Sequence, residues 1–262
     1  PLSKAASFFM PSDGEEFLYG FLVPVPIKAV AAPATLRFTA VFRDLNGEPC
    51  RLDLSRGISI ETKKFLSEDI VLDKANTALR AKPDPAQIAE SAAFAKIFAV
   101  RDVTALYAAG PMVKPLNATW RETAGFGDER RYLYSGGGSD ASVHGGIDLG
   151  AKEGTDVFAC AAGRVAFAHL RILTGNTVVL EHLPGLFSIY MHLSAITVRE
   201  GDIVDSGDRI GLVGSTGLST GPHLHWELRI GDVSVNPYYW LSRPLLDKDG
   251  NSGKIKLPVE GR

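Results

Sequence analysis

The sequence predicts a mainly β protein with a small N-terminal β domain, a linking α-helix and a C-terminal antiparallel β-sheet body. Two observations predict this class. Short β-branched and aromatic runs recur between Gly, Asn and Asp in both halves of the chain, as is typical of closely spaced strands. A single stretch with apolar residues at helical spacing separates the halves. With 262 residues and 45% hydrophobic content, the chain can bury one large or two smaller cores.

The first part of the chain carries a hairpin pattern. Residues 34–43 alternate apolar and polar side chains for much of their length, and Asn46-Gly47 precedes the next run, PCRLDLS. This arrangement predicts a β-hairpin. The strand-like pieces GISIETKKF and DIVLD follow, and no apolar stripe of 3.6-residue period appears before residue 80. We therefore expect an N-terminal β domain over residues 1–82.

The next segment has the spacing of a helix over residues 84–109. Asp84 fits the N-cap, Pro85 the first helical position and Gln87 the third, a pattern like a capping box. Gly110-Pro111 would end the helix. We expect a helical linker over 83–110, and the apolar stripe of this helix to be buried against a β body.

Short β-branched and aromatic runs then return with many glycines, which predicts an antiparallel β body over residues 111–242. The remaining residues, 243–262, are polar and are expected to form a C-terminal tail. The two cysteines, Cys50 and Cys160, lie in different predicted parts. We expect two buried thiols rather than a disulfide scaffold.

Composition excludes several classes. The net charge of −2 and the absence of a long basic run give no reason to expect a nucleic-acid binder. Three prolines and Lys28 interrupt the longest apolar region near the N-terminus, so we expect no membrane helix there. We expect a mature or trimmed form, because no intact signal peptide opens the sequence and its first residue is Pro1.

All six histidines lie in the second half, and two of them form an H-x-H pair in GPHLHWEL. On a strand, His223 and His225 would share one face, while Leu224 and Trp226 would face the core. Burying two imidazoles side by side is costly unless something polar meets them. A bound metal is the simplest explanation.

Zinc takes three or four nitrogen, oxygen or sulfur ligands, and a catalytic site leaves one position for water. HGGIDLG supplies His144 and Asp148, and IYMHLS supplies His192 at the end of an apolar strand. The chain has no H-E-x-x-H pattern, so it is not a helical zinc protease. Each motif is weak alone, but together they indicate a zinc site.

These motifs, HGGIDLG, YMHLS and GSTGLSTGPHLHWEL, closely resemble the lysostaphin/LytM type of zinc murein endopeptidases. The similarity runs through about residues 112–242 and includes GFGDERR at 125–131. The resemblance implies that His144, Asp148 and His225 bind one zinc per chain. It also implies that His192 and His223 are catalytic beside the metal without binding it, and it does not decide which of them is the general base.

The same resemblance implies a zinc-dependent endopeptidase that hydrolyses peptide cross-links of bacterial peptidoglycan, with peptide stems as substrate. The preceding β domain is similar to that of envelope members from double-membraned bacteria. This favours cleavage of D-alanyl–diaminopimelate links and a place in the periplasm or cell envelope. The same resemblance is compatible with a regulatory protein partner.

Two alternatives come from other classes. A catalytically silent wall-binding or amidase-activating regulator is disfavoured because no catalytic position is substituted. A metal-independent β scaffold is suggested by VREGDIVDSGDRIG, which resembles a lipoyl-type hairpin but lacks the lysine that such carriers need at the turn.

Several other residues carry weaker expectations. We expect His169 at the surface or in a groove, His182 at the end of a strand, and Glu227 solvated. Tyr132 and Tyr134 could line the groove, and Ser219 and Thr220 are expected to fix a turn rather than act as nucleophiles.

Overall fold

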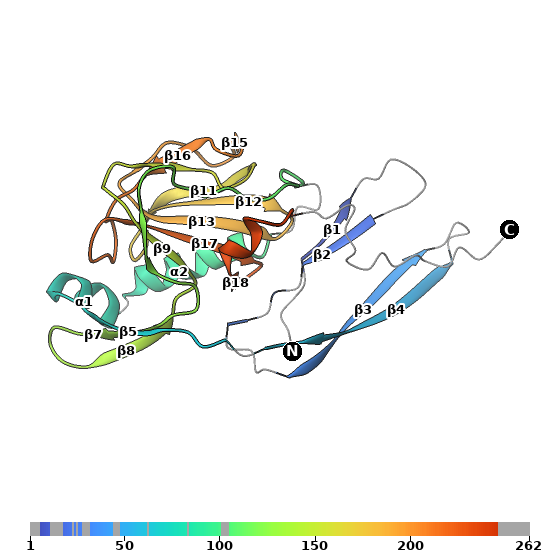
Figure 1. Cartoon of the computed structure of the whole chain (residues 1–262), viewed down its shortest axis with the longest axis horizontal. Helices are drawn as coiled ribbons and strands as arrows, with labels where there is room; N and C mark the ends of the chain where they lie inside the picture. Colours follow the sequence, from blue (N-terminus) through green and yellow to red (C-terminus); the bar gives the residue numbers. More distant parts are fainter. Residues whose placement is uncertain are drawn as a thin grey trace.

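The fold is mainly β, as the sequence predicts (Figure 1). The computed structural model describes residues 63–82, 84–100 and 105–245, and, nearer the N-terminus, 6–10, 18–22, 24, 26–27, 32–43 and 48–61. The Asn46-Gly47 turn and residues 246–262 of the predicted tail lie outside the described residues.

Two antiparallel strand pairs form the described N-terminal part. β1 (Ala6–Met10) pairs with β2 (Leu18–Leu22). β3 (Pro33–Arg43) pairs with β4 (Pro49–Ser59) along its full length, and this ribbon extends away from the rest of the fold (Figure 1). The strand pairing predicted for this region is confirmed.

The helical region differs from the prediction. The single helix expected over 84–109 is wrong in extent, because α2 spans Pro85–Ile97 and residues 105–109 are not helical. There the backbone N–H groups of Tyr107 and Ala108 donate instead to the carbonyl of His182. The predicted N-cap is correct, since the Asp84 side chain accepts from the Gln87 backbone N–H.

A short helix before residue 82 contradicts the all-β expectation for that segment. α1 spans Lys74–Ala81, and Asp73 caps it by accepting from the backbone N–H of Asn76. None of the α1 residues is fully buried. A helix this short, with no buried face, presents no apolar stripe for periodicity to reveal.

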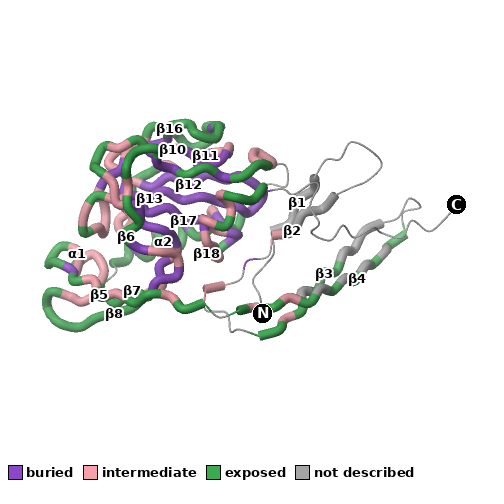
Figure 2. Tube along the Cα trace, viewed as in Figure 1, coloured by how far each residue is buried: buried purple, intermediate pink, exposed green. Residues whose placement is uncertain are grey.

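The large sheet is antiparallel throughout. Its strand order is β15-β11-β12-β13-β17-β9-β6, with β18 paired to β17. The strands are β6 (Arg121–Ala124), β9 (Gly146–Gly150), β11 (Gly163–Arg171), β12 (Gly175–Leu183), β13 (Leu186–Leu193), β15 (Ile203–Val204), β17 (His223–Ile230) and β18 (Val233–Val235). Its central strands contain much of the buried core (Figure 2).

α2 packs on this large sheet. Phe94 of α2 and its C-cap residue Phe98 are buried, and the Phe98 ring meets that of Phe187 edge to face at 5.3 Å between centroids. Val179, Ile189 and Met191 complete the same apolar cluster. The expectation that this helix buries its apolar residues against a β body is confirmed for Phe94, whereas Ile88 of the same predicted stripe is 60% exposed.

Two three-stranded sheets flank the large one. The first joins β10 (Asp156–Phe158), β16 (Arg209–Leu212) and β14 (Ala195–Ile196), and a 3₁₀ helix, η1 (Pro237–Trp240), follows β18. The second joins β5 (Ser67–Val71), β7 (Glu129–Leu133) and β8 (Ser139–Val143). β5 pairs with β7 in parallel, so a strand from the predicted N-terminal domain shares a sheet with the C-terminal body.

Cys160 is a buried free thiol, as expected, and burial raises the pKa of this thiol to about 11. The side chain of Cys50 lies outside the described residues.

Among the helices that the structure describes, none is both long enough and apolar enough to cross a membrane.

Candidate functional site

The H-x-H pair lies on β17, in the middle of the large sheet. His225 is opposite Asp148 of β9, and His223 is opposite Gly150. Leu224 and the Trp226 side chain are completely buried on the other face. The predicted division into a histidine face and a core face is therefore confirmed.

The three predicted metal ligands come together at this face. His144 Nε2 lies 3.0 Å from His225 Nδ1 and 3.1 Å from Asp148 Oδ1. His225 Nδ1 lies 2.8 Å from the same carboxylate oxygen. All three residues are buried, and together they form a group able to hold a metal ion.

The hydrogen bonds on the far side of each ring show which atoms face the centre of this cluster. His144 Nδ1 donates to the Gly125 carbonyl at 2.7 Å, and His225 Nε2 lies 3.5 Å from Glu227 Oε2, toward which it donates. His144 Nε2 and His225 Nδ1 therefore carry lone pairs and no hydrogen when the rings are neutral. Two nitrogen lone pairs and a carboxylate oxygen repel one another at these distances unless a cation or a shared proton lies among them. Two imidazole nitrogens and one carboxylate oxygen are ligands that zinc accepts, so the residues fit this metal.

Gly146 explains why β9 can approach β17 this closely. A Cβ at Gly146 would lie 2.5 Å from the Trp226 carbonyl oxygen and 2.8 Å from His225 Nε2. Any larger residue would displace the ring of His225, so the HGGID segment needs a glycine at this position.

Glu227 supports His225, which contradicts the expectation that this carboxylate is solvated. Glu227 is buried, and it accepts hydrogen bonds from Arg229 Nε at 2.7 Å and from the Ser234 hydroxyl at 2.5 Å. Burial alone would raise the pKa of Glu227, but the charge of Arg229 and the hydrogen bond with His225 lower it to about 2. Ser234 of β18 and Arg229 make burial possible because both bond to Oε1, while Oε2 faces His225.

The other side of the cluster is supported by Arg130, which sequence reasoning did not single out. Arg130 Nη2 donates to Asp148 Oδ2 at 2.5 Å, and its Nε donates to Glu68 Oε1 at 2.8 Å. Burial by itself would raise the pKa of Asp148, but the close contacts with His144 and His225, which share a proton with it when no cation lies among them, hold this pKa well below its usual range. GFGDERR gives no spacing signal for this role, because the contact joins β7 to β9 of a different sheet.

His192 and His223 lie side by side next to the cluster, with ring centroids 4.7 Å apart. His192 Nδ1 donates to the Thr216 carbonyl, and His223 Nδ1 donates to the Gly221 carbonyl, both at 2.8 Å. Nε2 of each neutral ring therefore keeps its lone pair, and that of His223 lies 3.8 Å from Asp148 Oδ1. Burial lowers the pKa of both rings, that of His192 to about 3, so both are neutral near pH 7.

The backbone of His192 is held in an unusual conformation. Its φ of 63° is the only positive value at a residue other than glycine in the described part of the chain. Such a conformation costs about 1 kcal/mol or more and persists where the surroundings enforce it. Here the backbone N–H of His192 donates to the Thr174 carbonyl at 2.8 Å, at a shift in the β12–β13 register, and the ring lies beside that of His223.

The remaining sequence expectations have mixed outcomes. His169 is exposed and His182 lies at the end of β12, both as expected. His182 is also fully buried, with both ring nitrogens hydrogen-bonded. The Ser219 hydroxyl donates to the Gly221 carbonyl at 2.8 Å, which agrees with a role in the turn. Tyr132 is buried, with the Arg80 guanidinium 3.6 Å from its ring centroid, so it does not line an open groove.

Comparison with known proteins agrees with a metallopeptidase site. Residues 142–237 match the model of Peptidase family M23. The chain is 48% identical over 95 residues to the DD-carboxypeptidase/endopeptidase Mpg of Neisseria meningitidis, covering 36% of this chain and 22% of that protein. It is 36% identical over 122 residues to the peptidoglycan DD-endopeptidase ShyA of Vibrio cholerae, covering 47% and 28%. The chain thus spans about a quarter of the length of these relatives.

A crystal structure of a Pseudomonas aeruginosa protein classed with the M23 peptidases has the same fold. The TM-score is 0.59 at 21% identity, and the likeness covers 91% of this chain and 88% of that one. At this identity the likeness supports the fold. The segment that matches the family contains all three predicted metal ligands, His144, Asp148 and His225. The chain therefore carries a metallopeptidase domain of Peptidase family M23, the LytM type.

Proposed function

We propose that this protein is a zinc-dependent endopeptidase that hydrolyses peptide cross-links of bacterial peptidoglycan. The observation that carries the proposal is the set of lone pairs that converge from His144, Asp148 and His225. Two further histidines, His192 and His223, each present one ring nitrogen beside that set.

In this proposal His144, Asp148 and His225 hold one zinc per chain. Zinc bound there would polarise the scissile carbonyl and lower the pKa of a water molecule toward about 7. Asp148 supplies only Oδ1 to the cluster, because Oδ2 is bonded to Arg130. The three protein ligands leave a position for water or substrate.

His192 and His223 are the proposed acid–base pair. Because burial keeps both rings neutral near pH 7, either Nε2 can accept the proton that the attacking water loses. The protonated ring can then stabilise the oxyanion or return the proton to the leaving amine. The hydrogen bonds to Thr216 and Gly221 hold each ring in the tautomer that this role needs.

The substrate class rests on the relatives. Two of them are named for DD-endopeptidase activity, one explicitly on peptidoglycan. We therefore propose peptide stems as substrate, D-alanyl–diaminopimelate links as the cleaved bond, and the periplasm or cell envelope as the site of action. Residues 111–242 would form the peptidase domain, and the preceding part would offer a surface for a regulatory protein partner.

Digestion of purified muropeptides tests this proposal. The zinc-loaded full chain is incubated with cross-linked dimers, and the products are identified by mass spectrometry. We expect dimers to be split at the D-alanyl–diaminopimelate bond, a chelator to stop the reaction and added zinc to restore it. A chain that binds zinc yet leaves every cross-linked substrate intact would support the silent regulator instead.

A further inference from the structure

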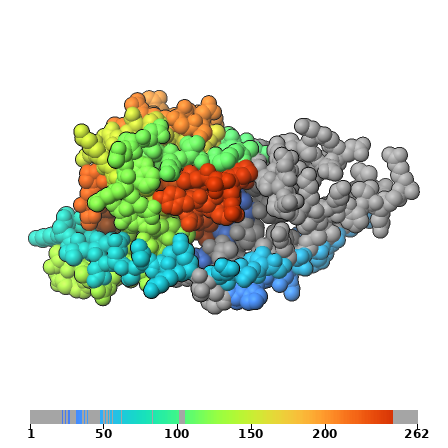
Figure 3. All heavy atoms as spheres, in the orientation of Figure 1, coloured from blue at the N-terminus to red at the C-terminus, as the bar shows by residue number. Residues whose placement is uncertain are grey.

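We propose that Arg130, held in place by Glu68 of β5, is a positioning residue for Asp148. A strand that precedes the family-matched segment would then complete the metal centre. The proposal rests on the function proposed above, in which Asp148 binds zinc through Oδ1. Figure 3 shows the chain around β5 and α1 packed against the region of β7 and β8.

The two oxygens of Asp148 have different partners. Oδ1 lies among the ligand nitrogens, 3.1 Å from His144 Nε2 and 2.8 Å from His225 Nδ1. Oδ2 accepts the hydrogen bond from Arg130 Nη2 at 2.5 Å. This bond fixes the plane of the carboxylate and leaves only Oδ1 for the metal.

Arg130 is itself fixed by a second carboxylate. Its side chain is 13% exposed, and Nε donates to Glu68 Oε1 at 2.8 Å. The planar guanidinium therefore connects two carboxylates in a fixed geometry, which the single point charge of a lysine cannot reproduce. Glu68 also balances the positive charge that Arg130 would otherwise place beside a divalent cation.

The residues just before β5 support the other half of the cluster. Asp128 accepts from the backbone N–H of Leu66 at 3.3 Å and from that of Gly125 at 2.7 Å. Gly125 is the residue whose carbonyl orients His144. The segment that contains β5 therefore contacts the supports of two of the three ligands.

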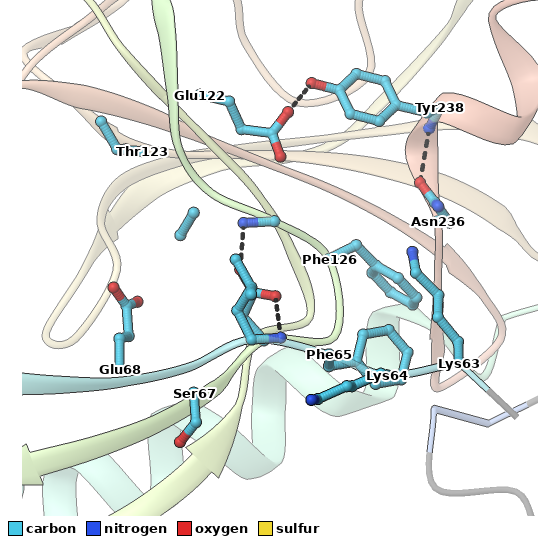
Figure 4. A pocket seen from close by; sticks show the side chains of 14 residues that line it. Lys63, Lys64, Phe65, Ser67, Glu68, Glu122, Thr123, Phe126, Asn236 and Tyr238 are labelled. Atoms are coloured by element: carbon cyan, nitrogen blue, oxygen red, sulfur yellow. Dashed lines mark hydrogen bonds between the residues drawn. The ribbon is translucent and has the colours of Figure 1, made fainter.

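The loop of residues 125–128 packs closely against Phe65. A Cβ added to Gly127 would lie 2.1 Å from the Phe65 ring, so only a glycine fits there. Figure 4 shows Phe65, Ser67 and Glu68 following one another along a pocket of about 500 Å³. Thr123, Gly125 and Asp128 also line this pocket, which places β5 directly beside the loop that carries the support of His144.

The adjacent ion pair on the same two strands provides a matched control. Asp69 and Arg131 are the next residues in the β5–β7 ladder and also form a salt bridge. Their side chains are 46% and 57% exposed, and neither contacts a predicted ligand, because neighbouring residues on a strand point to opposite faces. Removal of this pair perturbs the same strands without reaching the metal site.

The test measures zinc affinity of the full chain by competition with a chromophoric chelator. We expect Glu68→Gln, which removes the partner of Arg130 rather than a direct partner of a ligand, to weaken zinc binding up to about 10-fold, the lower end of the usual effect of losing a ligand's partner. Arg130→Lys should weaken it at least as much, and the shorter Glu68→Asp should have an intermediate effect. Asp69→Asn should bind zinc as the unchanged protein does. The absorption bands of the cobalt-substituted protein should shift in Glu68→Gln and stay unchanged in Asp69→Asn.

Each failure has its own signature. Thermal unfolding of the metal-free proteins shows whether every variant is folded before zinc is added. If the unchanged chain binds zinc and Glu68→Gln and Asp69→Asn have equal affinities, whether normal or reduced, the positioning role of the Glu68–Arg130 pair is overturned. If the unchanged chain itself binds no zinc, the proposed function fails first.

Discussion

His182 and His192 lie on adjacent strands of the large sheet and are both buried, yet their surroundings differ. Both ring nitrogens of His182 are used, since Nδ1 donates to the Ala162 carbonyl at 2.7 Å and Nε2 lies 2.7 Å from the Ser188 hydroxyl. His192 uses one, through Thr216. None of the described residues forms a hydrogen bond with its Nε2.

The difference shows that burial alone does not separate structural from functional histidines here. His182 is a satisfied core residue in a regular strand, whereas His192 combines a spare nitrogen with a positive φ. His144, His223 and His225 follow the same pattern as His192, with one ring nitrogen bonded outward and the other facing the cluster. The predictions below test what a spare ring nitrogen contributes to function and what a fully bonded ring contributes to stability.

The largest effect is expected when a spare nitrogen belongs to a proposed ligand. His225→Ala removes one of the three proposed ligands. Loss of a residue that only supports a ligand lowers metal affinity by up to about 100-fold, so we expect His225→Ala to lower zinc affinity by more than that. The measurement is zinc content after dialysis, with His182→Asn as the control that keeps its zinc. If His225→Ala retained zinc and His223→Ala lost it, the assignments within the H-x-H pair would be reversed.

A smaller effect is expected at the two histidines proposed for proton transfer. His192→Ala and His223→Ala should each keep their zinc but lose about 10²- to 10⁴-fold in turnover, the usual contribution of acid–base and oxyanion-stabilising groups. Turnover and zinc content are measured on the same samples. Retained turnover in either variant would contradict the role proposed for that residue.

The pattern of residues on strands predicted the two faces of the H-x-H pair, whereas the resemblance to LytM-type endopeptidases supplied the division into three metal ligands and two catalytic histidines. Period-two alternation placed His223 and His225 on one face and Leu224 and Trp226 in the core, and the structure agrees. His144 and Asp148 were also predictable, since both lie in one Gly-rich motif whose chemistry suits a metal. Local geometry fixes these features, so a single sequence reveals them.

The supports of the site were not predictable, because long-range pairing creates them. Glu68 and Arg130 are 62 positions apart and meet only because β5 pairs with β7 in parallel. The sequence predicted a solvated Glu227, but Arg229 and Ser234 of β18 bond to its carboxylate and help to bury it. The helix over 84–109 was overestimated, because apolar spacing continued beyond Ile97 while the backbone of Tyr107 and Ala108 bonded to His182.

The smallest expected effect concerns the stability contributed by the fully bonded histidine. Burial lowers the pKa of His182 to about 4, against about 6.5 in an unfolded chain. As pH falls below 6.5, the unfolded state binds a proton that the folded state refuses, so this contribution to stability is complete above 6.5 and is lost as pH falls toward 4. The loss is about 1.4 kcal/mol per pH unit, or about 2 kcal/mol between pH 7 and pH 5.

Urea unfolding at these two pH values, with zinc in excess, measures this contribution as a difference between variants. His182→Asn removes the titrating group and keeps a side chain able to donate to Ala162, so its stability should change about 2 kcal/mol less between pH 7 and pH 5 than that of the unchanged protein. His169→Asn is the control, because this histidine on β11 is 65% exposed and its replacement leaves the core unchanged. His192 and the zinc ligands are common to all three proteins, so their own pH dependence cancels in the comparison. Equal pH dependence in His182→Asn and His169→Asn would show that the buried ring of His182 takes up its proton without unfolding, and that its two hydrogen bonds do not hold it neutral.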